Sequence, residues 1–201
     1  MDYKQPILST SYFPCIAYLS ILNKHEEVLI EANESFKKQT HRNRTYILSA
    51  NGVLPLIVPV KRFKDISLPI VETEICYQTN WQTNHLRAIS SAYGKSTYFE
   101  YYFYQIENIL KKEHRYLIDL NNDITQLLLS KFKINTTLTN TSSYEKTIEN
   151  DYRDIFDKKH LLNDFQTKPY FQCFSNKFPF QNNLSSLDLL FNMGVDSKLY
   201  L

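Results

Sequence analysis

The sequence is poor in the residues that mark several classes of protein. It has three glycines, one tryptophan and three cysteines in 201 residues. Cys15, Cys76 and Cys173 are odd in number and far apart, so neither a disulfide framework nor a Cys/His zinc motif is expected. No window approaches the roughly 18 apolar residues that span a bilayer, and the N-terminus shows no signal segment. We therefore predict a cytoplasmic protein with free thiols and no membrane insertion.

Net charge is also nearly absent, because 23 Lys and Arg face 21 Asp and Glu. A formal charge of +2 gives no general attraction to nucleic acid, and no nucleic-acid partner is predicted. His25, His41, His114 and His160 show no metal-ligand spacing, so no metal is predicted, and the cofactor stays unassigned. Aromatic residues, by contrast, are plentiful, with 15 Tyr and 13 Phe. Most of these rings are expected in the core, although such a surplus can also line a ligand groove.

The N-terminal part of the chain alternates between strand and helix patterns. Residues 7–10 are typical of a short buried strand, 14–23 carry apolar residues at helical spacing, and 27–32 are typical of a second strand. Strand, helix and strand within about 30 residues predict a βαβ unit with a parallel pair. Asn51-Gly52 between two β-rich runs predicts a hairpin, and the prolines in 53–60 place its second strand at an edge or a bulge.

The rest of the chain is mainly helical in pattern. One further strand is predicted at 71–77, followed by helices that include 81–92, then 97–111, 114–131 and 185–192. The polar segment 135–149 is predicted to be a loop or flap. We therefore predict a single α/β domain over residues 1–201. Its N-terminal βαβ unit and hairpin form a mixed sheet, and its helical C-terminal half packs on that sheet.

Basic residues near the hairpin are candidates for binding an anion. Arg42 and Arg44 are two residues apart and would share one face of a strand, and Lys61 follows on the partner strand. Two guanidinium groups and an ammonium form a receptor for phosphate or carboxylate. The alternative is a structural ion pair with Glu31 or Glu34.

Two further residues are candidates for catalysis. His85 is the best candidate general base, because the pKa of an unperturbed histidine lies near neutrality. It shares a helical face with Trp81, so a packed core histidine is the alternative. Asp188 could orient a histidine or receive a substrate amine, or it could be structural. Tyr12 and Tyr18, together with Trp81, would line the pocket.

The turn after the first strand offers a second anion site. Ser9, Thr10 and Ser11 precede a helix whose free backbone N–H groups can bind an anion. The arrangement resembles the HIGH motif of nucleotidylyltransferases, with Tyr18 in the place of a histidine. Simple N-capping by a hydroxyl is the alternative.

Five strings, in order along most of the chain, resemble the WbqC-like family, which is named after a protein encoded in O-antigen gene clusters. They are Tyr12-Phe13-Pro14-Cys15-Ile16-Ala17-Tyr18, Arg42-Asn43-Arg44, Asn51-Gly52 with Val58-Pro59-Val60-Lys61, Trp81 and His85 before Ala92-Tyr93, and Leu184-Ser185 through Asp188 to Gly194. The chain departs from many members at Cys15, where they have Trp, and at Ala17, where they have Gly. Its length resembles the short members common in Bacteroidetes.

The resemblance implies a role in the synthesis of cell-surface polysaccharide, with transfer chemistry. The reading that follows is a transferase of a small acyl or aminoacyl group onto a phosphorylated or nucleotide-linked sugar. Its predicted catalytic residues are His85 and Asp188, and its predicted substrate-binding residues are Arg42, Asn43, Arg44, Lys61, Tyr12, Tyr18 and Trp81. A non-catalytic assembly factor of a glycan pathway and a HIGH-like nucleotidylyltransferase remain alternatives.

Overall fold

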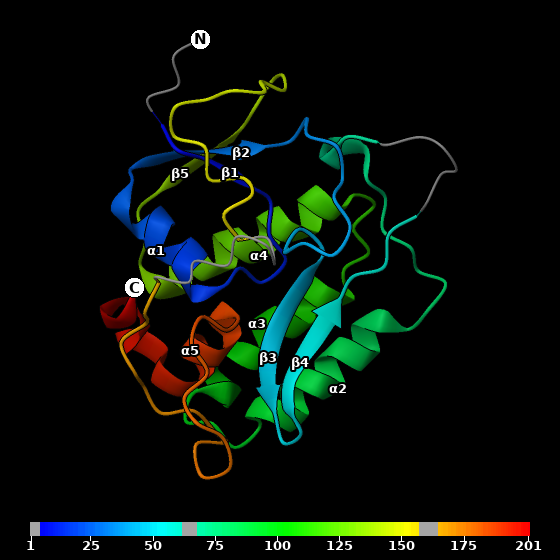
Figure 1. Ribbon diagram of the computed structural model, residues 1–201. Helices are drawn as coiled ribbons and strands as arrows, with labels where there is room; N and C mark the ends of the chain where they lie inside the picture. The colour runs from blue at the N-terminus through cyan, green and yellow to red at the C-terminus, as the bar shows by residue number, and fades with distance from the viewer. Residues whose placement is uncertain (1–4, 62–67, 157–164) are drawn as a thin grey trace.

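The computed structural model describes residues 5–61, 68–156 and 165–201. Within these ranges the helices and strands follow one another along the chain as shown in Figure 1. The strands are β1 (Ile7–Ser9), β2 (Glu27–Glu31), β3 (Arg44–Ser49), β4 (Gly52–Ile57) and β5 (Thr137–Asn140). The helices are α1 (Ile16–Lys24), α2 (Trp81–Tyr93), α3 (Phe99–Lys111), α4 (Leu117–Phe132) and α5 (Ser186–Met193), with 3₁₀ turns η1 (Ile70–Glu72) and η2 (Gly194–Tyr200). The predicted α/β class, with most helices in the C-terminal half, is confirmed.

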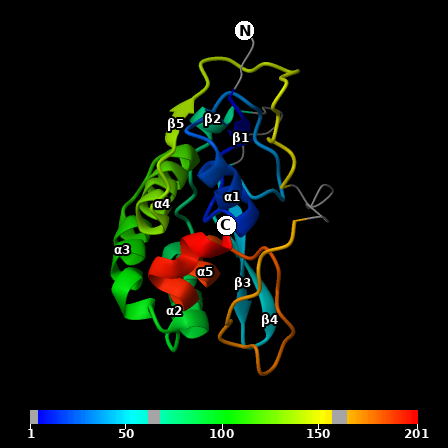
Figure 2. The same ribbon diagram turned by 90° about the vertical axis from the view of Figure 1, so that its left-hand side faces the viewer.

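Three parallel strands form the larger sheet, in the order β1-β2-β5. The expected βαβ unit is therefore present, with α1 connecting the outer strand β1 to the central strand β2. Figures 1 and 2 show α1 and α4 beneath this sheet. On the outer side of β1, the Ile7 N–H donates to the Asn150 carbonyl and the Tyr152 N–H donates to the Ile7 carbonyl. Residues 150–152 thus cover an edge that would otherwise expose unpaired backbone groups.

The hairpin β3–β4 forms a second, antiparallel sheet of two strands, separate from the parallel one in the described residues. Its turn closes between Ser49 and Gly52, and Gly52 has a φ of 101°, which favours glycine. Pro55 lies on β4, which pairs with β3 alone, so the predicted edge position is confirmed. One face of the hairpin is buried through residues such as Ile47 and Leu56, and α2 and α5 contact β3.

Two local predictions differ from the structure. The strand expected at 71–77 is instead η1 followed by isolated bridges, Val60 to Ile75 and Glu74 to Tyr116. These bridges reach two different segments, so no continuous ladder can form there. The loop expected at 135–149 contains β5, which pairs with β2 along Glu27 to Ile30. Because β5 is an exposed edge strand of Thr, Leu and Asn, it lacks the apolar alternation that marks a half-buried strand.

The apolar core joins both halves of the chain. Its main cluster takes buried side chains from β1, α1 and the hairpin, and also from α2, α4 and α5. Helix α5 is buried along Ser186 to Asn192, and the Ser185 side chain caps it by accepting from the Leu187 N–H. The Ile16 N–H donates to the Leu184 carbonyl and the Ser186 N–H to the Pro14 carbonyl, so the start of α5 is fixed against the start of α1. No described helix combines the length and apolarity needed to cross a bilayer.

Candidate functional site

A small cavity lies at the carboxyl end of β1, the position where open parallel sheets commonly bind ligands. Its volume is about 10 Å³, enough for one water-sized group. Three consecutive hydroxyl residues and three basic side chains contribute to its wall, which consists of Ser9, Thr10, Ser11, Tyr18, His41, Arg42, Arg153 and Phe156. The strand-to-helix turn suspected from the sequence is thus part of the cavity.

Arg42 is 1% exposed and lies within a network of hydrogen bonds. Its Nε and Nη2 donate to the two carboxylate oxygens of Glu34 over 2.8 and 2.6 Å. Nη2 also donates to Ser9 Oγ over 2.6 Å and lies 3.4 Å from an Asp154 oxygen. This is the structural ion pair with Glu34 that the sequence offers as the alternative to anion binding, and it neutralises the charge of Arg42.

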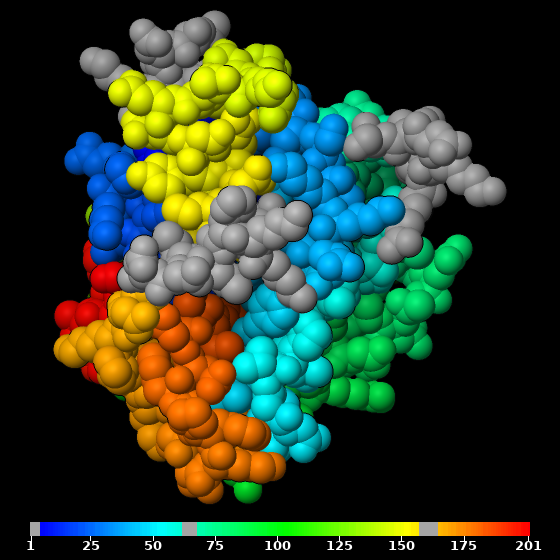
Figure 3. Space-filling view, in the orientation of Figure 1, coloured from blue at the N-terminus to red at the C-terminus, as the bar shows by residue number. Residues whose placement is uncertain are grey.

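Arg153 is compensated in the same way from the other side of the cavity. Its Nε donates to Asp151 over 2.9 Å, and its Nη1 donates to Glu31 over 3.1 Å and to the Glu145 carbonyl over 2.8 Å. Figure 3 shows the segments 32–43 and 141–156 side by side. Lys37 of the first segment forms an ion pair with Asp154 of the second. Acidic side chains therefore neutralise both arginines in the cavity wall.

Arg44 and His41, unlike Arg42 and Arg153, have no acidic partner among the described residues. Arg44 forms no ion pair with a described residue, and its Nε is buried without a hydrogen-bond partner in the described part of the chain. His41 Nδ1 is likewise buried and unpartnered there. Burial, with Arg44 and then Arg42 nearby, lowers the pKa of His41 to about 4, so the ring is neutral at pH 7. The His41 ring contacts Tyr46, with 5.5 Å between ring centroids.

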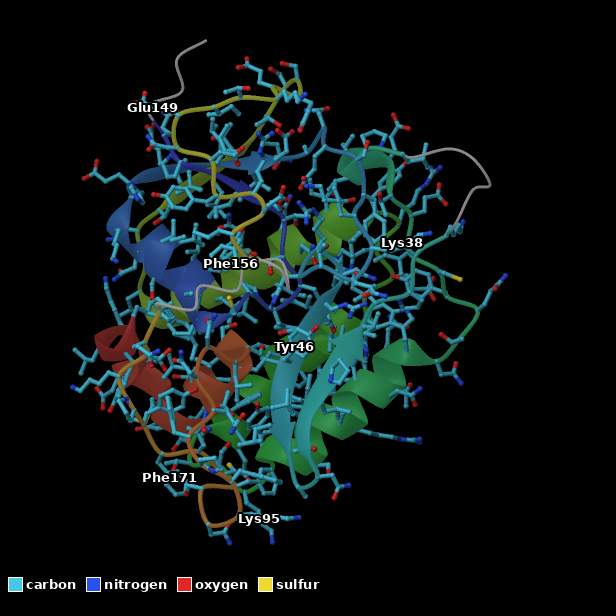
Figure 4. All side chains as sticks on the ribbon, in the orientation of Figure 1. Lys38, Tyr46, Lys95, Glu149, Phe156 and Phe171 are labelled. Atoms are coloured by element: carbon cyan, nitrogen blue, oxygen red, sulfur yellow. The ribbon has the colours of Figure 1, made fainter. Side chains whose placement is uncertain are left out.

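Tyr18 brings α1 into the cavity wall. Its hydroxyl donates to the Ser9 carbonyl over 3.0 Å, and its ring lies 5.4 Å from that of Phe156. Phe156, labelled in Figure 4, comes from a segment far from α1 in the sequence. Of the residues that the sequence put forward as site residues, Arg42 and Tyr18 meet in this cavity.

His85, Tyr12 and Trp81 form a separate buried cluster. The Tyr12 hydroxyl lies 2.8 Å from His85 Nδ1, and the Trp81 ring stands edge-on to His85 at 5.2 Å. Burial lowers the pKa of His85 to about 4, against a smaller rise from a hydrogen bond with the Ile57 backbone. His85 is therefore neutral at pH 7 and connects α2 to the hairpin and to the start of α1. None of the three residues lines the cavity.

The remaining predicted residues also lie outside the cavity wall. Asn43 donates from Nδ2 to the Val58 carbonyl over 2.8 Å and so extends the hairpin pairing. Lys61 is exposed and pairs with Glu74 over 2.6 Å in a surface groove of about 360 Å³ that also holds Arg115.

Asp188 is buried in α5, where it accepts from the Tyr170 hydroxyl over 2.6 Å and from Gln172 Nε2 over 2.9 Å. Burial raises the pKa of its carboxyl. The carboxyl group thus fixes the segment around residues 170–172 to the core. The basic groups and the imidazole of His85 do not share one pocket, and the roles of His85 and Asp188 in catalysis stay predictions.

Sequence reasoning missed three residues of the cavity wall, His41, Arg153 and Phe156. His41 directly precedes the Arg42 motif, but its spacing from the other histidines bears only on metal binding. Arg153 and Phe156 lie far from β1 in the sequence, and no periodicity connects them to it.

Within the described ranges, no cluster of three or more His, Cys, Asp or Glu could hold a metal ion. Burial raises the pKa of the free thiol of Cys15 to about 11.

The fold and the cavity define an α/β protein whose candidate site lies beyond the end of the first parallel strand. The chain belongs to the WbqC-like protein family, which matches residues 9–164. It is also similar to the "Uncharacterized protein Rv1507c" of Mycobacterium tuberculosis, with 28% identity over 143 residues, 71% of this chain. The alignment spans 62% of the length of that relative. No solved structure matches the chain significantly.

Proposed function

We propose that this protein is a cytoplasmic transferase that moves a small acyl or aminoacyl group onto a phosphorylated or nucleotide-linked sugar during the synthesis of cell-surface polysaccharide. The observation that carries the proposal is the cavity at the carboxyl end of β1, where Ser9, Thr10 and Ser11 meet Arg42, Arg153 and His41. Hydroxyl and guanidinium donors of this kind suit the oxygens of a phosphoryl group.

The size of the cavity limits what enters it. A volume of about 10 Å³ accepts one oxygen atom or one water rather than a whole sugar. The ligand therefore places one end of an anionic group in the cavity, and the rest of the molecule lies outside. Arg42 and Arg153 are already paired, and the Ser9 hydroxyl accepts from Arg42 and donates to the Arg153 carbonyl, so these groups shape the cavity wall rather than attract the ligand through net charge.

A ligand screen by thermal unfolding tests the proposal. Sugar nucleotides, sugar phosphates and acyl-coenzyme A are added singly to the full chain. A ligand at a hundred times its dissociation constant should stabilise the folded state by about 2.7 kcal/mol. Radiolabelled acyl or aminoacyl transfer to the stabilising sugar then tests the reaction itself.

Two variants at Ser11 show whether a stabilising ligand uses the cavity. Ser11→Val places two methyl groups where the cavity has no room to spare and should abolish the stabilisation. Ser11→Ala is the matched control and should retain part of it, since it removes one hydroxyl donor but adds no bulk to the cavity. If no compound of these classes stabilises the protein and a protein partner co-purifies instead, the assembly-factor alternative replaces the transferase.

A further inference from the structure

The outer face of the hairpin carries polar atoms that make no hydrogen bond within the part of the chain that the structure describes. In the register of β3 and β4, Arg44 pairs with Ile57 and Tyr46 with Pro55, so these four side chains share one face. The opposite face, which includes Thr45 and Ile47, is buried. Ile57 is 41% exposed although it is a large apolar residue.

Two atoms at the inner end of this face are buried without a partner in the described residues, Arg44 Nε and His41 Nδ1. A buried polar atom without a hydrogen bond costs about 1–3 kcal/mol, so native proteins rarely leave one unsatisfied without a reason. Here two such atoms belong to neighbouring basic side chains, because Arg44 acts electrostatically on His41. Neither side chain has a described carboxylate partner. Two basic side chains, each with an unpartnered nitrogen among the described residues, together form a candidate receptor for an anion.

The ring of Tyr46 completes the arrangement. It contacts the His41 ring at 5.5 Å and is partly exposed on the same face as Ile57. A flat aromatic surface beside a guanidinium that has no carboxylate partner in the described ranges fits a ligand in which an oxyanion is attached to a ring. His41 also lines the cavity beyond β1, so this face continues directly from it.

We infer that Arg44, His41 and Tyr46 form a subsite for an oxyanion joined to a sugar ring, with Arg44 and His41 binding the oxyanion and Tyr46 contacting the ring. The subsite depends on the proposed function in one point: the proposed substrate would extend from the cavity into the subsite. A sugar phosphate and a sugar carboxylate share the chemistry that it recognises.

An NMR titration of the full chain tests the subsite with three probes: inorganic phosphate, glucose 1-phosphate and glucuronate. Phosphate should shift the resonances of Arg44 and His41 and raise the pKa of the His41 ring, because a bound anion favours the imidazolium form. The charged groups around this ring are Arg42, Arg44 and Arg153, with Glu34 and Asp154 behind Arg42. Comparing glucose 1-phosphate with glucuronate shows which oxyanion is preferred.

Variants separate the three contributions. Arg44→Gln should weaken phosphate binding about 10- to 100-fold, the loss expected for a hydrogen-bonded charge, and His41→Phe should weaken it while keeping the ring contact with Tyr46. Tyr46→Ala should weaken glucose 1-phosphate and leave inorganic phosphate unchanged. Arg115→Gln, which changes an exposed arginine in another groove, is the control and should bind all probes normally.

The inference is overturned if Arg44→Gln binds phosphate as the unmodified protein does, or if phosphate shifts only the Lys61 and Arg115 groove. Its failure is distinguishable from failure of the proposed function. If Ser11→Val abolishes sugar-nucleotide binding and Arg44→Gln does not, the cavity stands and the subsite falls. If phosphate binds at Arg44 while no sugar derivative or acyl donor reacts, the subsite stands and the transferase falls.

Discussion

Replacing Arg42 by methionine should unfold the protein at a much lower temperature. Arg42 and Glu34 have side chains 2% and 3% exposed, with 2.6 Å between Nη2 and Oε2. Removing one partner leaves the other charge buried and uncompensated, which costs about 3–5 kcal/mol. That is a large part of a typical stability of about 5–15 kcal/mol. At about 2–4 °C per kcal/mol for a chain of this size, the melting temperature of Arg42→Met should fall by about 6–20 °C.

Thermal and urea unfolding at pH 7, followed by circular dichroism, measure this loss. Glu34→Leu should be similarly destabilised, and the double variant should lose clearly less than the sum of the two, because it buries no lone charge. Lys111→Gln is the control. Its pair with Glu107 is on the surface of α3, where such pairs contribute about 0.2–0.5 kcal/mol.

The reasoning is refuted if Arg42→Met is as stable as the unmodified protein. If ligand binding is lost in that stable variant, Arg42 is a ligand-binding residue, as the sequence suggested, and its pairing with Glu34 is secondary. If the single variants are destabilised and their effects simply add, the two side chains act independently and the description of a coupled pair is wrong.

Three other changes have defined outcomes. The pKa values of His41 and His85 are lowered to about 4, whereas an unfolded histidine titrates near 6.5. The free energy of unfolding should therefore be highest above pH 6.5 and should fall toward pH 4 by up to about 3 kcal/mol per histidine. Urea titrations at pH 7.5 and pH 5 measure this fall, and His85→Gln should make it smaller. Gly194→Ala should cost about 1–3 kcal/mol in thermal melts, because φ is 55° and the new Cβ would clash with the Tyr98 ring. An unchanged melting temperature contradicts this. Asp188→Ala should speed proteolytic cleavage within 165–183, since Tyr170 and Gln172 lose their hydrogen-bond acceptor. Asp188→Asn should speed this cleavage less. A loss of activity with normal protease resistance would instead support a catalytic role for Asp188.

Local patterns predicted the elements whose signals are local. The βαβ unit, the hairpin and four of the helices follow from apolar periodicity and from a single Asn-Gly step. The strand β5 was missed because an exposed edge strand needs no apolar alternation, and its place beside β2 depends on backbone pairing with residues far away in the sequence. The strand expected at 71–77 fails for the opposite reason, since alternation was present but no continuous partner was available.

The candidate site was predictable only in part. The hydroxyl residues after β1 and the motif containing Arg42 and Arg44 could be read from the sequence. Which arginine is neutralised could not, because Glu34 reaches Arg42 only after the chain turns between β2 and β3. Arg153 joins the cavity through an even longer separation. The sequence shows that a side chain is basic, whereas the tertiary structure decides whether an acidic side chain neutralises it.

The order of strands has a consequence for how the chain reaches its native state. Strands β2 and β5 are adjacent, although residues 32–136 separate them, and the start of α1 is tied to residues 184–186. During synthesis on the ribosome, the apolar side of the βαβ unit stays exposed until the segments that cover it have been synthesised. Chaperone binding would protect this surface meanwhile. A recombinant fragment limited to the family match, 9–164, would lack the segment that covers α1 and should aggregate.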